Sequence, residues 1–499
     1  MEIGVRDLSI VSFNVNGLLS FMKRRGYTES TFSELLESVC VSSQAGSAAK
    51  NVERPDIVCI QECKMSFSED LNNSTGCPGD YDSYFSLTES NKRYSGVATY
   101  CLKSTVVLEA ARGLSWLEEA PRQFDMNQKL TAEDLDGFAS DVSEAKCAYG
   151  VPLSEIDGEG RCVVTDHGHF VLLNLYVPLL RGRTEEKDEC DQLSSDCLQT
   201  QSRSQAQEET AESVDSERLR YRLAFHKYLD LALHLLEQLC GRRVVLAGDF
   251  NIILGKEDCH GDHGGLLADD CKSVSSAEIS ETRSFDEAYS WVRKLNIQMI
   301  QRFGLVDAYR HCHPDVKNKY TCWNQMNQSR LRNQGARIDL FLISKELTDR
   351  PIRSEILDHI YGSDHCPISL FLKLDESVPI DDTVNIKRPL PSICSRYLPQ
   401  CKQRQSTISQ FLASANGGAK PPRDQTSRPQ KRPPPGGHPL CKHGTACVKK
   451  KVTKPGANKG RFYWSCPKSD QQKCNTFVWI EQTCPREKIS NDLLNFINK

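Results

Sequence analysis

The sequence lacks any long apolar run. No stretch approaches the roughly 18–20 consecutive apolar residues that span a bilayer, which argues against a membrane protein or a membrane partner. The N-terminal residues also lack a basic segment followed by an apolar one, so we expect no secretory signal. The 22 cysteines are therefore expected to stay reduced, which favours metal sites and ordinary buried thiols over a disulfide framework.

Acidic residues are scarce in the C-terminal part of the chain. Residues 376–499 hold 22 Lys and Arg but only 8 Asp and Glu, whereas residues 1–375 hold 41 and 58. A basic appendage on an acidic body is typical of polyanion binding, although a merely soluble tail has the same charge.

The first 375 residues predict an α/β fold. Short apolar runs typical of buried strands occur at residues 8–15, 56–61, 96–102, 169–177, 243–250, 338–344 and 368–373. An amphipathic helix is predicted over residues 218–240, where Leu219, Leu223, Leu229 and Leu233 recur at helical spacing. Many strands and few long helices favour two packed mixed sheets with flanking helices over a βαβ repeat.

Composition divides the chain into four parts. We predict a catalytic body at residues 1–375, a flexible linker at 376–438, a small module at 439–482 and a tail at 483–499. Within the body, residues 181–217 are polar and acidic and are predicted to be a mobile insertion, and residues 258–284 a surface loop.

Six short polar motifs lie at the ends of the predicted strands, where sites are commonly built. Each alone is typical of a turn, a helix cap or a solvated strand end, but six such motifs in order favour one shared site. Acids and amides without basic neighbours indicate a hard divalent cation, and a His beside an Asp indicates proton handling. The motifs contain Asn14 and Asn16, Gln61 and Glu62, Asn174 and Tyr176, Asp249 and Asn251, Asp339, and Asp364 and His365.

The ordered motifs SFNVNG, IQECK, LNLYVP, GDFN, RIDLFLIS and GSDHCPI resemble the endonuclease/exonuclease/phosphatase superfamily. Within it they are most similar to the exonuclease III-like class II abasic-site endonucleases. The resemblance covers about residues 1–375, with insertions near 113–160 and 181–217. It implies a four-layered α/β sandwich. The superfamily also contains inositol phosphatases, sphingomyelinases and deadenylases, so these motifs alone do not choose the substrate.

The resemblance implies a metal site. Glu62 and Asn16 would hold Mg²⁺, for which Mn²⁺ could substitute, with Asp364 nearby. Asp249 and Asn251 could form a second Mg²⁺ shell. Some relatives carry an aspartate at the position of Asn16, which would alter the metal affinity.

The resemblance also implies catalytic roles. Asp249 would activate the attacking water, and Asn251 would position that water or the phosphate. His365 would donate to a phosphate oxygen, with Asp339 holding its imidazole, and Asn14 would support the site.

One more side chain of the body is implied to touch the substrate. The hydroxyl of Tyr176 would contact the phosphate. Three residues later this chain has Leu179, where some relatives carry an asparagine, which puts one contact to the substrate backbone in doubt.

The C-terminal module contains a candidate zinc site. The module is too small to fold without a stabilising metal ion or cross-link. Between and beside its predicted aromatic strands lie four candidate ligands, Cys441, His443, Cys466 and Cys474. From residue type and spacing alone, Cys447 and Cys484 are alternative zinc ligands. The segment resembles the GRF zinc finger, which implies those first four residues as structural Zn²⁺ ligands and binding of single-stranded nucleic acid.

Basic and aromatic side chains of this module could contact phosphates and bases. We expect at least half of the aromatic side chains to form the small core instead. The candidate contact residues are Lys450, Lys459, Arg461, Phe462 and Trp479.

The predicted linker contains a short docking motif. Gln405, Ile408, Phe411 and Leu412 resemble the motif that binds the DNA sliding clamp, proliferating cell nuclear antigen. One helical turn would present the three apolar side chains as a plug, and Gln405 would fill a polar slot. The motif is short and also arises by chance.

Together the three resemblances imply a Mg²⁺-dependent DNA repair nuclease of the nucleus, with 3′–5′ exonuclease, 3′-phosphodiesterase and weaker abasic-site activity. We expect a monomer, and additional cytoplasmic or mitochondrial pools are compatible with the sequence. Two alternatives stay open, an RNA-directed phosphodiesterase and a non-catalytic repair scaffold.

Overall fold

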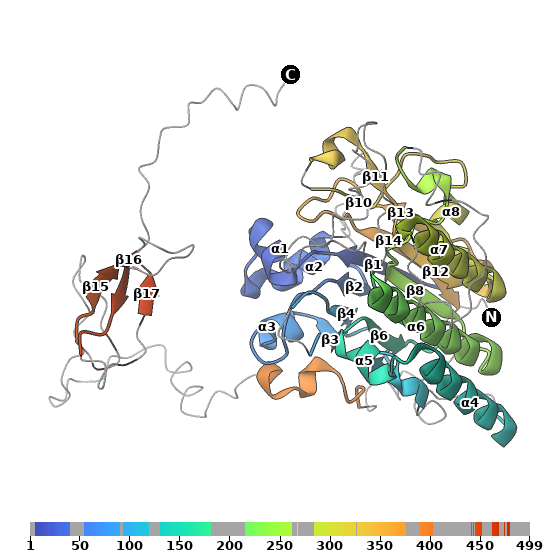
Figure 1. Cartoon of the computed structure of the whole chain (residues 1–499), viewed down its shortest axis with the longest axis horizontal. Helices are drawn as coiled ribbons and strands as arrows, with labels where there is room; N and C mark the ends of the chain where they lie inside the picture. The colour runs from blue at the N-terminus through green and yellow to red at the C-terminus, as the bar shows by residue number, and fades with distance from the viewer. Residues whose placement is uncertain are drawn as a thin grey trace. The chain divides into compact units, whose positions relative to one another are not determined.

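The structure is a computed structural model, and Figure 1 shows its course. It describes residues 5–39, 54–89, 93–118, 130–180, 215–261, 267, 284–325, 327–375 and 389–402, and within the C-terminal module residues 441, 443, 445–451, 462–468, 474 and 477–479. The chain divides into two compact units, residues 1–405 and 406–499. Among the described residues, no helix is both long enough and apolar enough to cross a bilayer.

The first unit contains two six-stranded mixed sheets. Sheet A comprises, in spatial order, β13 (Arg353–Ile356), β14 (Ile368–Asp375), β1 (Val5–Asn14), β2 (Ile57–Gln61), β4 (Val97–Leu102) and β3 (Tyr81–Ser86). Sheet B comprises β5 (Glu109–Arg112), β6 (Cys162–Asp166), β7 (Val171–Tyr176), β8 (Val244–Asp249), β12 (Asp339–Ser344) and β9 (Leu305–Asp307). A separate pair joins β10 (Cys322–Trp323) and β11 (Gly335–Ala336).

Helices cover the outer faces of the two sheets. A core beneath sheet A includes side chains of α1 (Leu18–Arg24) and α2 (Phe32–Ser38). The short α3 (Asn73–Gly76) adjoins it, and the hydroxyl of the core residue Tyr100 donates to the carbonyl of Thr75 in α3 (3.0 Å). A larger core beneath sheet B includes α4 (Ala132–Tyr149), α5 (Leu153–Gly158), α6 (Ser216–Leu233) and α7 (Phe285–Arg302). The short α8 (Ala308–Cys312) packs instead into the core between the sheets.

The alternation of side chains explains why most of the sheet strands are largely apolar. In β8, Leu246 faces the helices while Val245 and Ala247 enter the core between the sheets. In β1, Ile10 enters the same central core while Val11 faces the helices. A strand buried on both faces shows a continuous apolar run. The predicted four-layered sandwich of helices, sheet, sheet and helices is confirmed.

Polar side chains also join the two sheets at their centre. Gln61 of β2 donates its Nε2 to Asn174 Oδ1 of β7 (2.8 Å) and to Ser12 Oγ (3.0 Å). The amide of Asn174 donates in turn to the carbonyl of Ala98 (2.9 Å). All four residues are buried, so these hydrogen bonds satisfy polar groups that would otherwise disfavour stacking. Asn174 and Gln61 are therefore structural partners across the sandwich.

The predicted helix at residues 218–240 is α6, which begins at Ser216 and continues as a π-helical turn, His234–Leu239. Asp215 caps it by accepting from the backbone N–H groups of Glu217 and Arg218. The region near 113–160, expected as an insertion, contributes α4 and α5 to the core under sheet B. Most of the predicted insertion, residues 181–214, lies outside the described residues.

Residues 389–402 extend the first unit beyond the predicted boundary at residue 375. This segment, which we call the strap, lies against edge strand β3, where Cys394 forms a β-bridge with Tyr84. Ser395 Oγ lies 2.7 Å from Ser83 Oγ and donates to the carbonyl oxygen of Ser83 (2.8 Å). Arg396 pairs with Asp82. The expectation of a flexible linker is therefore wrong for these residues, because the strap covers an otherwise open sheet edge.

Another sequence-based boundary also differs from the structure. Asp258 was expected at the start of a surface loop, but its carboxylate is buried and pairs with Arg337 and Arg310. Residues 262–266 and 268–283 lie outside the described part of the chain.

The second unit contains a three-stranded antiparallel sheet of β15 (Val448–Lys451), β16 (Phe462–Ser465) and β17 (Phe477–Trp479). The last two match the aromatic strands expected from the sequence. The predicted clamp-binding residues Gln405, Ile408, Phe411 and Leu412, and the predicted contact residues Lys459 and Arg461, lie outside the described residues.

Candidate active site

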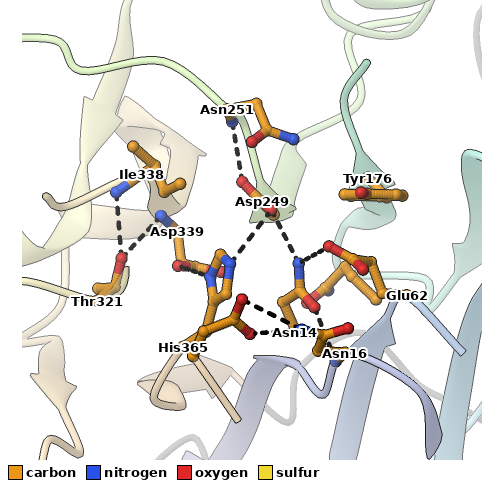
Figure 2. Close-up of polar contacts among 12 residues, drawn as sticks. Asn14, Asn16, Glu62, Tyr176, Asp249, Asn251, Thr321, Ile338, Asp339 and His365 are labelled. Carbon is orange, nitrogen blue, oxygen red and sulfur yellow. Dashed lines mark hydrogen bonds and ion pairs between the residues drawn. The ribbon is translucent and has the colours of Figure 1, made fainter. Parts of the chain in front are cut away.

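The polar motifs of both sheets meet at one end of the sandwich (Figure 2). In sheet A, β1 and β2 run parallel, with Asn14 beside Gln61. In sheet B, parallel β7 and β8 bring Tyr176 beside Asp249, and antiparallel β12 places Asp339 on the other side of Asp249. The ends of five strands and the loops that follow them therefore deliver acids and amides to one place.

Asn14 connects the two sheets within the site. Its single amide nitrogen, Nδ2, donates to Glu62 Oε1 (2.8 Å) and to Asp249 Oδ2 (2.9 Å). All three side chains are buried, with exposed fractions of at most 3%. Two carboxylates from different sheets thus share one neutral donor, and their negative charges are held a few ångströms apart.

Four residues of this site adopt left-handed backbone conformations. Asn16, Glu62, Lys64 and Asn251 have φ between 47° and 51°, and they are four of the seven such non-glycine residues in the described chain. Asparagine tolerates this conformation, but for Glu62 and Lys64 it is strained. Such strain clusters at functional sites because the surrounding structure must hold it in place.

The turn after β8 orients Asp249 and Asn251. Asp249 Oδ1 accepts from the backbone N–H of Asn251 (2.9 Å), and Asn251 Nδ2 donates to the carbonyl of Val177 (2.9 Å). Gly248 precedes the turn with φ 143°, and a Cβ there would lie 1.9 Å from the carbonyl oxygen of Leu175. A glycine is therefore required for β7 and β8 to approach closely beside the site.

The electrostatics of the site favour a carboxylate that can take up a proton. Burial raises the pKa of Asp249 to about 7, and the nearby carboxylates of Asp339 and Glu62 act in the same direction. A carboxyl group with this pKa exchanges a proton near neutral pH, which suits a general base.

His365 and Asp339 form a buried pair. Nδ1 of His365 lies 2.8 Å from Asp339 Oδ2, and its Nε2 lies 3.9 Å from Asp249 Oδ2. Burial opposes a charged imidazole, but the Asp339 carboxylate outweighs it and raises the pKa of His365 well above its usual value. The imidazolium form therefore predominates at neutral pH, with Nε2 directed toward the carboxylates.

Sequence reasoning missed Thr321, which holds the start of β12. Its Oγ1 accepts from the backbone N–H groups of Ile338 and Asp339, both at 3.1 Å. This places the Asp339 carboxylate, whose Oδ1 has no hydrogen-bond partner in the described chain. No sequence pattern around Thr321 indicates a functional role, because its contacts form only when the folded chain brings it next to the start of β12.

Asn16, Asp364 and Lys64 form a second polar group beside Glu62. Asn16 Nδ2 donates to both carboxylate oxygens of Asp364 at 3.1 Å. Lys64 Nζ lies 2.6 Å from Asn16 Oδ1 and 3.1 Å from Glu62 Oε2. Lys64 was not predicted, although it belongs to the quoted motif IQECK and follows Glu62 by two residues.

The donor set fits a hard divalent cation. Oxygens of Glu62 and Asn16 converge on the Lys64 ammonium, so the site already accommodates a positive charge at that point. Ligand atoms of Glu62, Asp249 and His365 also lie within 4.8 Å of one another. Carboxylate and amide oxygens are the ligands that Mg²⁺ prefers, whereas the Nδ1 of His365 is already engaged by Asp339.

Tyr176 and Leu179 lie beside this group on the chain that leaves β7. Burial raises the pKa of Tyr176 well above its usual value, and the neighbouring Glu62 carboxylate acts in the same direction. The guanidinium of Arg161 lies over the tyrosine ring, 4.4 Å from its centre. Leu179 is buried, with an exposed fraction of 8%, so its side chain packs into the protein.

The structure also brings together the four predicted zinc ligands. His443 Nδ1 lies 3.7 Å from Cys441 Sγ and 3.5 Å from Cys466 Sγ, and Cys474 completes a group within 4.8 Å. Tetrahedral Zn²⁺ with ordinary Zn–S and Zn–N bonds requires S···N separations of ~3.6 Å. The four residues therefore fit zinc. Cys447 is buried beside them but is not in the group, and Cys484 lies outside the described residues.

Basic and aromatic side chains adjoin on the small sheet of the module. The ammonium groups of Lys449 and Lys451 lie 4.3 and 5.7 Å from the ring centre of Phe462. Lys450, between them in sequence, is exposed. Trp479 is described only as part of β17, whose backbone pairs with Tyr463.

Comparisons with known proteins identify two family matches in this chain. The sequence matches the Endonuclease/Exonuclease/phosphatase family over residues 11–365 and the GRF zinc finger over residues 439–483. Similar curated proteins are named DNA-(apurinic or apyrimidinic site) endonuclease 2. The one from Schizosaccharomyces pombe is 27% identical over 375 residues, and the one from Homo sapiens is 27% identical over 416 residues.

These alignments cover 73% and 81% of this chain, but only 58% and 66% of the yeast and human relatives. A crystal structure of the Xenopus laevis APE2 catalytic domain resembles the fold with a TM-score of 0.52 and 23% identity, and the match covers 80% of this chain and 99% of that one. The family match extends over well over half of the sequence, so the resemblance seen in the motifs is confirmed. The chain belongs to the Endonuclease/Exonuclease/phosphatase family.

Proposed function

We propose that this protein is a metal-dependent DNA repair nuclease that hydrolyses phosphodiester bonds. The observation that carries the proposal is the convergence of Glu62, Asp249 and the His365–Asp339 pair from two sheets at one buried site. The relatives named as abasic-site endonucleases support DNA as the substrate. The match to a GRF zinc finger supports a nucleic-acid ligand as well.

We further propose that the enzyme acts mainly at 3′ ends, as a 3′–5′ exonuclease and 3′-phosphodiesterase, and more weakly at abasic sites. This finer assignment rests on the combined resemblance of body, linker and module. We propose that the protein acts in base excision and single-strand break repair and in the response to DNA damage.

Glu62, Asn16 and Asp364 would hold Mg²⁺, and Mn²⁺ would suit the same oxygen donors. The metal, when bound, supplies positive charge that stabilises the phosphate oxygens as the transition state develops. Asn14 keeps the Glu62 and Asp249 carboxylates at a constant separation through its two hydrogen bonds.

The protein's own residues handle the proton. Asp249, oriented by the backbone of Asn251, accepts a proton from the water that attacks phosphorus. The new P–O bond forms as the bond from phosphorus to the leaving oxygen breaks. His365 donates from Nε2 to a non-bridging phosphate oxygen, because Nδ1 is held by Asp339. The phenol of Tyr176 donates to a second phosphate oxygen, and together these groups stabilise the developing charge.

The remaining parts would recruit the enzyme to its substrate. We propose that the module, held by structural Zn²⁺, binds single-stranded DNA through Lys450, Phe462 and the neighbouring basic residues. The motif at residues 405–412 would bind the sliding clamp, and the protein would act as a monomer in the nucleus.

The substrate assay uses the full chain with Mg²⁺ or EDTA and end-labelled nucleic acids. Duplex DNA with a recessed 3′ end, a blocked 3′ end or an internal abasic site tests the proposed specificity, and matched RNA tests the RNA-directed alternative. Metal-dependent cleavage of DNA that Glu62→Gln abolishes supports the proposal. Preferential cleavage of RNA would reassign the substrate, and an inert wild-type protein would favour the scaffold.

A pull-down with the clamp tests the linker motif. The double variant Ile408→Ala and Phe411→Ala should lose binding because the apolar plug is removed, while its cleavage of DNA without the clamp stays unchanged. Binding equal to that of the wild type would show that the motif is a chance match.

A further inference from the structure

Helix α6 carries a buried cation directly behind the candidate active site. Arg222 is 1% exposed and is among the largest fully buried side chains of the described residues. It forms no ion pair with a carboxylate in the described chain, and its Nε has no hydrogen-bond partner there. Burying an arginine without an acid is costly, and a long apolar side chain would pack a helix more cheaply.

The two ends of the guanidinium reach two different catalytic segments. Nη1 donates to the carbonyl oxygen of Pro178 (2.8 Å), and Nη2 donates to the carbonyl oxygen of Phe250 (3.0 Å). Pro178 follows Tyr176 by two residues, and Phe250 lies between Asp249 and Asn251. Arg222 therefore joins the chain leaving β7 to the chain leaving β8 at the point where both enter the site.

The planar geometry of arginine suits this connection. Its two terminal nitrogens have a constant separation and direction, so two carbonyl groups bound to them are held in a defined mutual position. Two further contacts close the same junction. The backbone N–H of Val177 donates to the Asp249 carbonyl (2.9 Å), and Asn251 Nδ2 donates to the Val177 carbonyl (2.9 Å).

The charge of Arg222 also lies in the electric field of Asp249, the proposed general base. Burial lowers the pKa of Arg222 to about 9, and the neighbouring Tyr289 phenol and Asp249 carboxylate oppose this change. Arg222 is therefore still a cation at neutral pH. A buried positive charge close to Asp249 stabilises the negative charges of the carboxylates that converge in the site.

We propose that Arg222 is a positioning residue, which sets the placement of Tyr176 relative to Asp249 and Asn251 by holding the Pro178 and Phe250 carbonyls together. This inference rests on the proposed nuclease function, since those side chains matter only if the site acts on a phosphate. Arg222 itself does not touch the substrate.

The test compares full-length Arg222→Met with a matched control, Arg293→Met. Arg293 is another largely buried arginine, on α7, and its Nε donates to the Leu254 carbonyl (2.9 Å) farther along the chain leaving β8. Both variants remove a buried guanidinium, and Arg222→Met removes the hydrogen bonds to both the Pro178 and the Phe250 carbonyls.

We expect Arg222→Met to lower kcat by about 10- to 100-fold with KM within about threefold of the wild type, because small misplacement of catalytic groups has effects of this size. Arg222→Lys, which keeps the charge and one hydrogen bond, should recover part of the loss. Arg293→Met should keep kcat within about threefold at a similar melting temperature. A kcat of Arg222→Met equal to that of Arg293→Met would overturn the inference.

A second readout does not depend on activity. Amide hydrogen exchange of Arg222→Met should increase both in residues 176–180 and in residues 249–254, whereas Arg293→Met should affect only the second segment. Unchanged exchange in residues 176–180 would overturn the inference even if the enzyme is active. A wild-type protein inert on every substrate would instead refute the proposed function, and the exchange result would still decide the connection.

Discussion

At the scale of single residues, the candidate site depends on neutral and cationic groups that keep three carboxylates close together. Asn14 donates to two of them, and His365 pairs with the third, Asp339. This arrangement holds Asp249 near its protonation midpoint at neutral pH, since its pKa is raised to about 7. Removing the carboxylate should therefore affect chemistry far more than stability.

We expect Asp249→Asn to lower kcat by at least 10²-fold, because the amide keeps the shape of the side chain but cannot accept the proton of water. The melting temperature should stay the same or rise, since a buried charge is removed next to two others. Steady-state kinetics on a DNA substrate and a thermal melt check both expectations. A variant that retains wild-type kcat would show that Asp249 is not the base.

Glu237 predicts a dependence of stability on pH. Burial raises the pKa of this carboxyl from 4.5 to about 7, and its Oε1 accepts a hydrogen bond from Ser344 Oγ. The folded protein therefore binds a proton more tightly than the unfolded chain, so stability falls as the pH rises from about 4.5 to 7.

Glu237→Gln should remove this loss. The variant should match the wild type at pH 5 and should be more stable at pH 8 by roughly 1–2 kcal/mol, once solvent screening of the half-buried group is discounted. Chemical denaturation at both values measures the difference. Glu144→Gln, on the exposed face of α4, serves as control, and an equal response of the two variants would contradict the expectation.

The residue scale also shows what sequence alone can predict. The polar residues were identified because their motifs lie at or beside the ends of apolar runs, and the structure brings the catalytic and metal-site candidates among them to one place. Lys64 and Thr321 were not, since a lysine after a strand or a threonine before one is ordinary. Arg222 lies in an amphipathic helical pattern, and its burial becomes visible only when the neighbouring strands are in place.

At the scale of elements, strands buried on both faces were predicted well and those with mixed composition were not. Strands β1, β2, β7, β8, β12 and β14 have continuous apolar runs, because they lie between the central core and the helices. Edge strand β3, with the sequence YDSYFS, has no such run, although all of its residues are buried. Its polar groups are covered by the strap, which local sequence does not reveal.

The strap predicts a stability effect. Replacing residues 389–402 by a Gly/Ser segment of equal length should lower the free energy of unfolding by roughly 2–5 kcal/mol, because buried Cys394 and Cys401 and the Ser395 hydrogen bonds are lost. Urea denaturation of the full chain measures this. Tyr397→Ala, at a residue 42% exposed, is the control and should change stability by less than 0.5 kcal/mol. Equal stability of strap replacement and wild type would show that the segment is only a linker.

At the scale of the whole molecule, the fold of each unit is stabilised by a different kind of interaction. The body buries large apolar cores, whereas the module contains a small cluster around Cys441, Cys447 and Cys466. A fold with so little apolar burial needs the metal to be stable. Composition predicted a separate C-terminal module, but the predicted end of the body at residue 375 lies before the strap. The strap packs on β3, which is distant in sequence, so composition does not reveal this contact.

Zinc removal should therefore unfold the module alone. A strong chelator, or the substitution Cys466→Ser, should abolish the aromatic near-UV circular dichroism signal of the isolated segment 406–499, which contains Trp464 and Trp479. The melting transition of the body should stay within about 2 °C in the full chain. Release of one zinc per chain, measured with a colorimetric dye, accompanies the change. Retention of module structure without zinc would contradict the assignment of the four ligands.

The hydrogen bonds of Asn14 have a further consequence. Glu62 directly follows β2 of sheet A and Asp249 ends β8 of sheet B, so the pair exists only when the two sheets are stacked. A nascent chain that has completed only the N-terminal strands, or a proteolytic fragment that retains one sheet, has only some of the required acids. Under the proposed function, immature and damaged copies of this nuclease would thus be unable to cut the genome, and cleavage activity would itself report that the sandwich is complete.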